Sequence, residues 1–565
     1  MTAPVVDRWG DRFTEAERAL LAPFVTDLDA PIFGLRNLPE VVKGALFSRY
    51  SRTDKSLRRI LLDEFIQAPE SGFAAIVGAV RDAQRAPGGE QIVAVRQAEA
   101  FYERVLIGYG DDSVAELGGA HVACEGVSNI AAKALEDSRI GISPLEKSTR
   151  YVVFNRKVEG RYRYLREPRI MESRHAVRYE AALDSLFDTY STLLEPTIAA
   201  VRARTPRDEA TSERAYNSAT RAKACDLLRG LLPMATLTNV GLFGNGRAFE
   251  YLLTKLYAAP LDELGELAES MQLALDALIP SFVKRAKSER GRMQQEYLRG
   301  MRERISSVVR SQLSVAADSD VDRYYDDGQR TTDYGQVTLV DYDPDAEAKT
   351  VAAILYPHTD LPLDQVRALA ERLSAEERLA IIRAYVGERG SRFHKPGRAF
   401  ETPSYTFDLL ADLGAYRDLQ RHRILTQERQ RYTVRHGYVT PPELMEYGLA
   451  APYAGALERA AEACETIALD LPDQAQYVVP LAFRVRWRVT INLRAAYHLA
   501  ELRSAPQGHP SYRQIAQAIY ARIRAVHPTL AEGMHFVDLS DYALERLDAE
   551  RRLDAKLGRA GREQS

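Results

Sequence analysis

Cysteine is scarce in this chain. Its 565 residues include three cysteines, Cys124, Cys225 and Cys464, which are too few and too scattered for a disulfide framework or for the spacing of metal ligands. We expect each to be a small buried hydrophobe rather than a nucleophile. The sequence therefore predicts no metal site, and it offers no candidate for a catalytic nucleophile.

Long apolar runs and an excess of one charge are also missing. No apolar stretch approaches the roughly 20 residues of a membrane span, and the N-terminus lacks the apolar segment of a signal peptide. The 76 Lys and Arg residues stand against 79 Asp and Glu residues, a formal net charge of -3. This balance gives no overall electrostatic footprint for nucleic acid. We expect a cytoplasmic protein that binds neither membranes nor nucleic acids.

The pattern of apolar residues is mainly helical. A composition of 45% hydrophobic and 27% charged residues is that of a globular protein, and the length suits two or more domains. Residues 261–275 place apolar side chains at helical spacing until Pro280 interrupts the pattern. Residues 363–385 predict two short helices broken near Ser374, an N-cap candidate with Glu377 three positions on.

Two segments of the second half predict strands. Residues 337–342 look like an opening strand, and the stretch 316–336 before them, rich in Asp, Ser, Thr, Gly and Tyr, is typical of a linker. Residues 483–489 alternate apolar side chains with arginines, and such a period of two indicates a strand. Its arginine face is explained equally well by solvent or acidic partners and by contact with phosphate.

One loop sequence occurs twice, and each copy lacks what the other keeps. The first, at 138–151, reads Ser-Arg-Ile-Gly-Ile-Ser-Pro-Leu-Glu-Lys-Ser-Thr-Arg-Tyr, and the second, at 421–432, reads Arg-His-Arg-Ile-Leu-Thr-Gln-Glu-Arg-Gln-Arg-Tyr. Leu-Leu-Pro at 231–233 and Val-Val-Pro at 478–480 are each followed at twelve residues by an asparagine. Such self-similarity indicates a duplication.

Both copies resemble the signature R-H-R-x-x-S-x-N-E-x-S-x-R-Y of the flavin-dependent thymidylate synthases. Before the second copy, residues 400–407 are similar to that family's E-H-A-x-F-T-F segment. Before the first, the family's G-H-x-S-v-x-E-H has four matches and two replaced histidines: Gly110, Ser113, Val114 and Glu116 match, and Asp111 and Leu117 are the replacements.

The resemblance implies an α/β fold, helix-rich with mainly antiparallel sheets, in two fused copies. The first copy would span 37–300 and the second 336–565, joined by the linker at 316–336. The family assembles four domains, and an interface used between copies must still be buried after fusion. We therefore expect a homodimer that forms a pseudo-tetramer of four domains.

The activity implied by the resemblance is the reductive methylation of dUMP to dTMP. Methylenetetrahydrofolate would supply the carbon and NADPH the reducing power, through FAD, and in the mechanism usually given for the family no enzyme cysteine attacks the base. Position and charge are then what the protein must supply. Two alternatives stay open: a flavin-dependent enzyme for another uridine nucleotide, and a non-catalytic nucleotide- or flavin-binding relative.

The family's nucleotide site lies between subunits, and its residues can be carried over one by one. The first copy would contribute Glu146, Ser148, Arg150 and Arg229, and the second would contribute Arg421 and Arg503. The converse pairing is lost, because Ser138, Leu256 and Gln476 stand where it needs arginines. The resemblance thus implies one composite site per chain.

The flavin contacts implied by the resemblance fall mainly on the second copy. They are Arg421, His422, Arg423, Asn492 and His498, where His498 replaces an asparagine of the family, with Ser48 near the start of the first copy. The family's A-Q-x-E-I-R segment appears at 508–513 as Gly-His-Pro-Ser-Tyr-Arg. This departure and the shortened loop of the second copy both affect the expected geometry of flavin and folate binding.

Overall fold

The computed structural model describes residues 11–38, 40–50, 53–67, 115–138, 140–150, 152–316 and 335–563. Several residues of the sequence patterns lie outside the described residues: Gly110, Asp111, Ser113, Val114, Arg139, Tyr151 and most of the linker at 316–336.

The chain divides into two compact units that interleave along the sequence. The first unit holds 1–125, 134–146 and 239–313, and the second holds 126–133, 147–238 and 314–565. The middle of the first predicted copy thus belongs to the same unit as the whole of the second. The compact units are defined by packing, whereas the two copies are defined by their similarity in sequence. The units therefore do not test the copy boundaries at 37–300 and 336–565, which stay a prediction.

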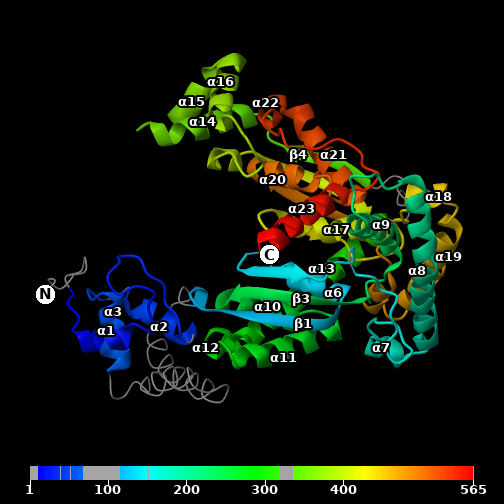
Figure 1. Cartoon of the computed structure of the whole chain (residues 1–565), viewed down its shortest axis with the longest axis horizontal. Helices are drawn as coiled ribbons and strands as arrows, with labels where there is room; N and C mark the ends of the chain where they lie inside the picture. The colour runs from blue at the N-terminus through cyan, green and yellow to red at the C-terminus, as the bar shows by residue number, and fades with distance from the viewer. Residues whose placement is uncertain are drawn as a thin grey trace. The chain divides into compact units, whose positions relative to one another are not determined.

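The first unit contains a three-stranded sheet with helices around it. Its strands are β1 (Gly119–Ser128), β2 (Ile142–Glu146) and β3 (Leu237–Asn245), in the order β1-β3-β2. β2 and β3 are antiparallel, with Ile142 opposite Gly244 and Glu146 opposite Val240. The helix α10 packs on α11 and α12 (Figure 1). The helices, with η marking short 3-10 or π turns, are α1 (Glu15–Leu21), α2 (Glu40–Tyr50), α3 (Leu57–Ile60), η1 (Leu61–Ile66), α10 (Gly246–Tyr257), α11 (Asp262–Asp276), α12 (Pro280–Val283), η4 (Lys284–Lys287) and α13 (Glu289–Ala316). The helix α6 (Asn129–Glu136) begins in the second unit and ends in the first.

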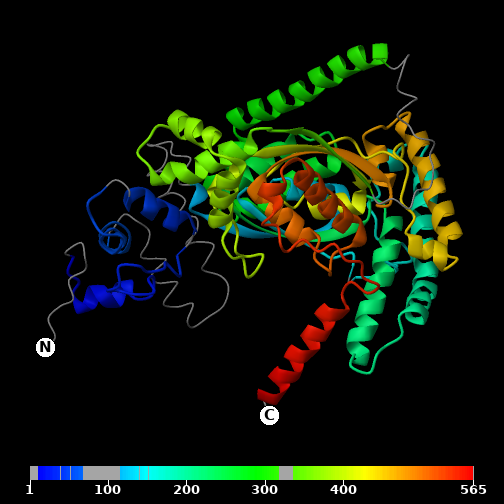
Figure 2. The same ribbon diagram turned by 90° about the horizontal axis from the view of Figure 1, so that it is seen from above.

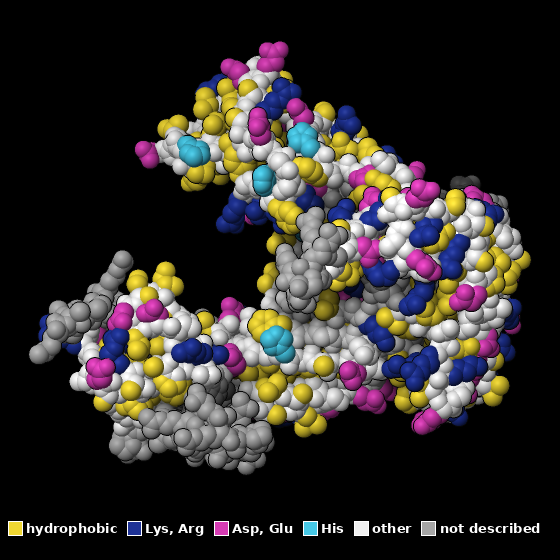
Figure 3. All heavy atoms as spheres, viewed as in Figure 1, with side chains coloured by type: hydrophobic (Ala, Val, Ile, Leu, Met, Phe, Trp, Pro, Cys, Tyr) yellow, Lys and Arg dark blue, Asp and Glu magenta, His cyan; other side chains and the backbone are white. Residues whose placement is uncertain are grey.

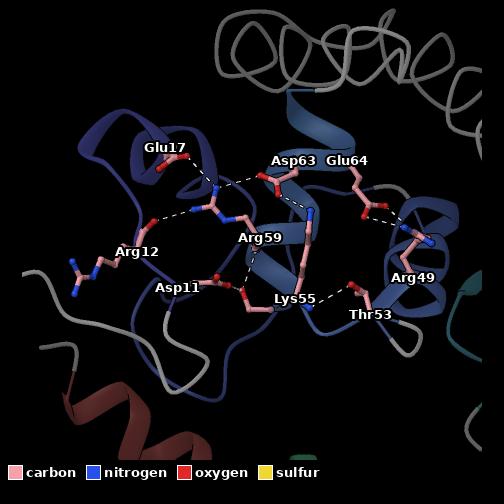
Figure 4. Close-up of polar contacts among 10 residues, drawn as sticks. Asp11, Arg12, Glu17, Arg49, Thr53, Lys55, Arg59, Asp63 and Glu64 are labelled. Carbon is pink, nitrogen blue, oxygen red and sulfur yellow. Dashed lines mark hydrogen bonds and ion pairs between the residues drawn. The ribbon is translucent and has the colours of Figure 1, made fainter.

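Ion pairs join the short N-terminal helices of this unit. Arg59 reaches both Glu17 and Asp63 at 3.2 Å, and Lys55 reaches Asp63 at 3.0 Å (Figure 4). Thr14 and Glu17 form a capping box at the start of α1, which satisfies backbone N–H groups that the first helical turn leaves free.

The second unit is built on a four-stranded antiparallel sheet. Its strands are β4 (Gly335–Tyr342), β5 (Ser404–Asp412), β6 (Thr426–Arg429) and β7 (Arg484–Asn492), in the order β4-β5-β7-β6. In the first sheet, a strand, a helix and a second strand are followed later by a strand that pairs between them. The second sheet repeats that arrangement with β5, α17, β6 and β7, as expected of a duplicated fold.

Helices cover the second sheet and extend from it. α8 packs on α9 and α19, and Figure 2 shows α8 and α19 side by side. The helices are α7 (Pro168–Met171), α8 (Ala176–Arg204), α9 (Glu213–Leu228), η3 (Arg229–Leu231), α14 (Ala346–Leu355), η6 (Tyr356–His358), α15 (Leu363–Arg372), α16 (Ala375–Val386), η7 (Arg398–Glu401), α17 (Leu413–Leu419), α18 (Pro442–Glu446), α19 (Ala450–Ala468), η8 (Gln474–Val478), α20 (Leu493–Arg503), α21 (Pro510–Val526), α22 (Pro528–Ala531) and α23 (Leu547–Glu563).

The two proline steps pair with each other inside the second unit. Pro233 and Pro480 form an antiparallel bridge. The amide of Met234 donates to the carbonyl of Val479 at 2.9 Å, and the amide of Leu481 donates to the carbonyl of Leu232 at 2.9 Å. Exchanging equivalent residues of the two copies converts one bond into the other. The fused copies therefore meet across a local pseudo-two-fold axis, as an isologous contact does between identical subunits.

The helices expected from the sequence are present. α11 spans Asp262–Asp276, and Pro280 occupies the first turn of α12, where its missing N–H costs nothing. Ser374 caps α16 and forms a capping box with Glu377. The predictions of a helix-rich fold and of antiparallel sheets are confirmed.

The alternating segment near 483–489 is strand β7, and its two faces differ as the sequence indicates. Val485, Trp487 and Val489 are buried. On the other face Arg486 forms an ion pair with Asp408 of β5 at 2.6 Å, so an acidic partner answers this arginine. On the molecular face in Figure 3, Lys and Arg side chains are interspersed with Asp and Glu. Within the described residues, no helix is both long enough and apolar enough to cross a membrane.

Candidate functional site

Four of the six predicted substrate residues lie in one cluster of the second unit. We call Arg150, Arg229, Arg421 and Arg503 the arginine cluster. Arg150 follows the first loop copy, Arg229 opens η3 after α9, Arg421 follows α17, and Arg503 ends α20. Two of them thus come from each copy. A cation at the last residue of a helix such as α20 is also favoured by the helix dipole.

Asp226 holds Arg150 in place. The Arg150 Nε and Nη2 atoms each donate to one Asp226 oxygen at 2.8 Å, and both side chains are largely buried. Such a bidentate pair fixes the plane of the guanidinium. Burial disfavours the Asp226 carboxylate, but the charge and hydrogen bonds of Arg150 outweigh it and lower the pKa of Asp226 below its ordinary value.

Arg229 crosses the first turn of α17 at a glycine. Its Nη1 donates to Asp418 at 3.3 Å, and its Nη2 is buried without a hydrogen-bond partner among the described residues. A Cβ added at Gly414 would lie 2.9 Å from that Nη2 and 2.8 Å from Asp412 Oδ1. Only glycine therefore leaves room for this guanidinium beside the N-cap of α17.

Tyr512 and His422 position two members of the cluster. The Tyr512 ring lies 5.9 Å from the Arg150 guanidinium and 5.6 Å from that of Arg503. Arg503 Nε donates to His422 Nε2 at 2.8 Å, so this nitrogen carries no proton. Burial and the charge of Arg503 lower the pKa of His422 well below its usual value, which keeps the imidazole neutral.

Asp418 pairs with Arg229 at 3.3 Å and is under the charge of all four guanidinium groups. Burial opposes its ionisation, but the charges of the arginine cluster, led by Arg229, lower its pKa below the ordinary range. Asp412, at the start of the same helix, responds differently. Burial raises the pKa of Asp412, although its oxygens accept hydrogen bonds from Ala415 and Ser511. The electrostatics of the site are thus those of a cationic cluster with ionised Asp226 and Asp418 inside it.

A pocket of about 450 Å³ lies in the first unit, and one of about 530 Å³ opens beside Arg150 in the second. Both volumes are in the range of ligand pockets. The first contains Asn245 and Arg247, the counterparts of Asn492 and Arg494. The second is lined by Arg150, Glu195, Ile198, Arg202, Asn217, Ser218, Arg221 and Ala222. Guanidinium groups thus line the pocket that adjoins the arginine cluster.

The other two predicted substrate residues lie where the first loop copy passes from one unit to the other. Ser148 belongs to the second unit, and its Oγ accepts the backbone N–H of Arg150 at 3.3 Å. It therefore supports the turn that carries Arg150. Glu146 is the last residue of β2, is buried, and belongs to the first unit.

Two of the predicted flavin residues of the second copy, His422 and His498, lie close together. His498 lies with its ring centroid 5.6 Å from that of His422. Burial and the nearby charges of Lys395 and Arg392 lower the pKa of His498 to about 4. Asn492 caps α20 by accepting the Ala495 amide at 2.8 Å.

The remaining flavin candidates differ in placement. Arg423, the last residue of the Arg-His-Arg triplet at 421–423, is exposed, and Arg421 is half-buried. Ser48 lies buried on α2, in the first unit. Of the predicted flavin set, Arg421, His422, Arg423, Asn492 and His498 share the second unit.

The positions that lost their arginines have local structural roles. Ser138 donates to the Leu135 carbonyl at 2.7 Å at the end of α6, and Leu256 is buried in α10. Gln476 accepts the Tyr432 amide at 3.2 Å. None of these side chains is a cation, so the converse pairing lacks the charge that a phosphate needs.

The sequence comparison did not identify several residues of the site. Asp226 and Asp418 each stand three residues before an arginine of the cluster, a shared spacing that could have drawn attention to them. Tyr512 lies in the segment 508–513 that departs from the family pattern. Arg513, the one match in that segment, is buried and donates to the Ser504 carbonyl at 2.8 Å, which is a structural role.

The cysteines are buried thiols. Burial raises the pKa of Cys124 to about 11 and that of Cys464 to about 12, and it also raises the pKa of Cys225. Thiols of this kind form little thiolate at neutral pH. No group of three or more His, Cys, Asp or Glu side chains in the described part of the chain could hold a metal ion.

A family model described as thymidylate synthase complementing protein matches residues 66–281 and 338–529. The chain belongs to this family. The two matched segments confirm the prediction of a tandem flavin-dependent thymidylate synthase domain. Membership supports a thymidylate synthase-like enzyme, and it implies the use of a flavin.

Relatives match the chain over its whole length. It is 43% identical to a UPF0159 protein of Chlamydia muridarum (strain MoPn / Nigg) over 553 residues, 98% of this chain and 100% of the relative. A UPF0159 protein of Thermoplasma acidophilum is 34% identical over 543 residues, covering 91% and 99%. The tandem arrangement therefore occurs in relatives of both sources.

Two other proteins each match about a third of the chain. A flavin-dependent thymidylate synthase of Geobacter sulfurreducens is 26% identical over 206 residues, 34% of this chain and 84% of the relative. Among solved structures, the UMP/dUMP methylase PolB from Streptomyces cacaoi bound with 5-Br dUMP matches with 20% identity and a TM-score of 0.29, covering 35% of this chain and 94% of that one.

Proposed function

We propose that this thymidylate synthase-like protein methylates dUMP to dTMP. Methylenetetrahydrofolate would supply the carbon and NADPH the reducing power, with FAD as the bound cofactor. One observation carries the proposal. The arginines that the family comparison takes from two different copies, Arg150 and Arg229 with Arg421 and Arg503, belong to one compact unit, and the charges of all four act on Asp418.

The arginine cluster suits a nucleotide monophosphate. Guanidinium groups donate paired, charge-assisted hydrogen bonds that match phosphate oxygens. Arg229 Nη2, buried without a partner among the described residues, is a donor that a phosphate oxygen would satisfy. Leaving such a buried donor unsatisfied costs about 1–3 kcal/mol, and ligand binding would remove that cost.

The neighbours of the cluster would orient it before the substrate arrives. Asp226 fixes the plane of Arg150 through two hydrogen bonds of 2.8 Å. Neutral His422 accepts a hydrogen bond from Arg503 at 2.8 Å, and this bond keeps the Nε atom of Arg503 turned toward the Arg-His-Arg triplet at 421–423. Prepositioned donors contribute because they need no reorganisation when charge arrives or develops.

The residues around His422 fit a cofactor with a polyanionic part. Arg421, His422 and Arg423, with Asn492 and His498, would hold FAD, and the charges of Arg392 and Lys395 next to His498 suit its pyrophosphate. Bound FAD would supply the hydride chemistry that methylation needs. The same His422 contacts Arg503, so cofactor and nucleotide residues support each other.

A flavin stoichiometry and an assembly follow from the same proposal, and two alternative functions would use the same residues. One composite site per chain implies one FAD per chain, and two chains would form a homodimer with four domains. A flavin-dependent enzyme for another uridine nucleotide, or a non-catalytic nucleotide- or flavin-binding relative, would use the same arginines. Base and sugar specificity separates the two enzymes from each other, and turnover separates either enzyme from the binding protein.

Activity assays on purified protein separate them. We expect a flavin absorption spectrum and NADPH-dependent formation of dTMP from dUMP with methylenetetrahydrofolate, faster than with UMP or dCMP. Arg229→Gln and Arg503→Gln should each weaken dUMP binding at least tenfold, given about 1.5–3 kcal/mol for a charge-assisted contact.

Arg486→Gln is the matched control, because Arg486 lies on β7 and pairs with Asp408. Its dUMP affinity should equal that of the wild type. Unchanged affinity in both Arg229→Gln and Arg503→Gln would rule out the composite phosphate site, and absence of flavin at saturating FAD would favour the binding protein.

A further inference from the structure

Three carboxylates lie beside the arginine cluster, and the contacts that hold them differ. Asp226 is used by Arg150 through both of its oxygens. Asp412 caps α17 and accepts from Ser511. Asp418 instead lies near the end of α17 and accepts from Arg229 Nη1 at 3.3 Å.

Asp418 is less deeply buried than the arginine with which it pairs. Its side chain is 17% exposed, whereas that of Arg229 is 6% exposed. Aspartate has a single short stem, so a modest rotation would separate its carboxylate from Arg229. Asp412 has less freedom, because its carboxylate is buried between a helix start and Ser511.

A carboxylate and a phosphate bind a guanidinium group through the same kind of hydrogen bond. Both are oxygen anions that accept its N–H groups, and Asp418 faces the arginine cluster with the charge that a ligand would bring. In the protein without ligand, Asp418 offsets the mutual repulsion of four cations. With ligand, its charge opposes that of the phosphate, since like charges a few ångströms apart in a partly buried site repel strongly.

We propose that Asp418 competes with the nucleotide phosphate for the arginine cluster and so determines how strongly an anion must bind in order to enter. This rests on the proposed function, since it takes the cluster to be the phosphate site. Asp418 is then a specificity-determining residue. It selects a dianionic phosphate ester, which can engage several arginines at once, against singly charged anions that cannot displace the carboxylate.

The test is the Asp418→Asn variant, which keeps the shape of the side chain and removes its charge. Calorimetric titration at constant ionic strength should show dUMP binding about tenfold tighter than in the wild type. Inorganic phosphate should bind more tightly as well, and the advantage of dUMP over acetate should shrink. Without ligand the variant should unfold at a lower temperature than the wild type, and saturating phosphate should narrow that gap.

Asp408→Asn is the control, because Asp408 is an acid of the same unit that pairs with Arg486 on the sheet. Its affinity for dUMP should not change. Equal or weaker dUMP binding by Asp418→Asn would overturn the competition and make Asp418 a ligand contact or a bystander. If neither protein binds dUMP, the proposed function fails instead, and the phosphate titration alone decides the role of Asp418.

Discussion

Replacing Gly414 by alanine should weaken both the fold and the nucleotide site, against the usual effect of this substitution. Gly414 lies in the first turn of α17, where alanine would ordinarily stabilise a helix by about 0.5–1 kcal/mol. Here the new Cβ would come within 2.9 Å of Arg229 Nη2 and 2.8 Å of Asp412 Oδ1. Arg229 or the helix must move.

The size of the effect follows from what can give way. Asp412 Oδ1 is held by the Ala415 amide at 2.9 Å, so most of the displacement should fall on the tip of Arg229. Overpacking of this kind costs about 1–3 kcal/mol. A misplaced Arg229 forfeits a charge-assisted phosphate contact of about 1.5–3 kcal/mol, which corresponds to roughly tenfold to more than a hundredfold in affinity.

Two measurements check this prediction. Denaturant unfolding can be followed by the fluorescence of Trp487, which is buried and lies 5.4 Å from the ring of Tyr416 on α17. Calorimetry with dUMP gives the affinity. Gly265→Ala in α11 is the control, because a Cβ there meets nothing within 4 Å, and it should be neutral or stabilising. A Gly414→Ala protein that is more stable than the wild type and binds dUMP normally would refute the steric argument.

Three further outcomes are expected. Flavin released by denaturation should amount to one FAD per chain, because the Arg-His-Arg triplet exists only at 421–423, and a ratio near two would contradict this. Replacing all three cysteines by serine or alanine should leave activity intact apart from a packing loss, since burial raises the pKa of Cys124 to about 11 and that of Cys464 to about 12; a folded but inactive triple variant would point to thiolate chemistry. The folded-state pKa of Asp226 is lowered, chiefly because the pairing with Arg150 outweighs burial, so its stabilising effect is present above the unfolded pKa of about 3.9 and is lost as pH falls below it. The difference in the free energy of unfolding between the wild type and Asp226→Asn should therefore be largest above about pH 5 and should vanish in acid. A difference that does not change with pH would disprove the linkage.

The sequence predicts those parts of the site whose spacing survived duplication. Arg229 is found by its spacing before the first proline step, and Arg503 by its spacing after Asn492. Both spacings survive because the elements are the same in the two copies: a short helix, η3 or η8, reaches the proline step, and the next strand, β3 or β7, ends at the asparagine. Ser374 is found because a capping box is local, and three residues decide it. Position along the chain was sufficient in these cases.

The partners of these residues could not be predicted in the same way. Asp418 faces Arg229 across 189 positions of sequence, and no local pattern reports such a contact. Tyr512 lies in the segment 508–513, where the match to the family pattern is poor, so the pattern does not point to it. The interleaving of the two units was also not predictable, because repeats are visible in a sequence and packing is not.

The mutual pairing of the two proline steps has a consequence for how the protein is made. The carbonyls of Gly230 and Leu232 accept from Ala482 and Leu481, residues that leave the ribosome much later. At roughly 5–20 residues per second, the wait is on the order of ten to fifty seconds. During that time the first proline step exposes backbone that its partner will later satisfy, and such unpaired backbone can bind another chain. Synthesis of this tandem protein should therefore depend on holdase chaperones more than synthesis of a single-domain relative.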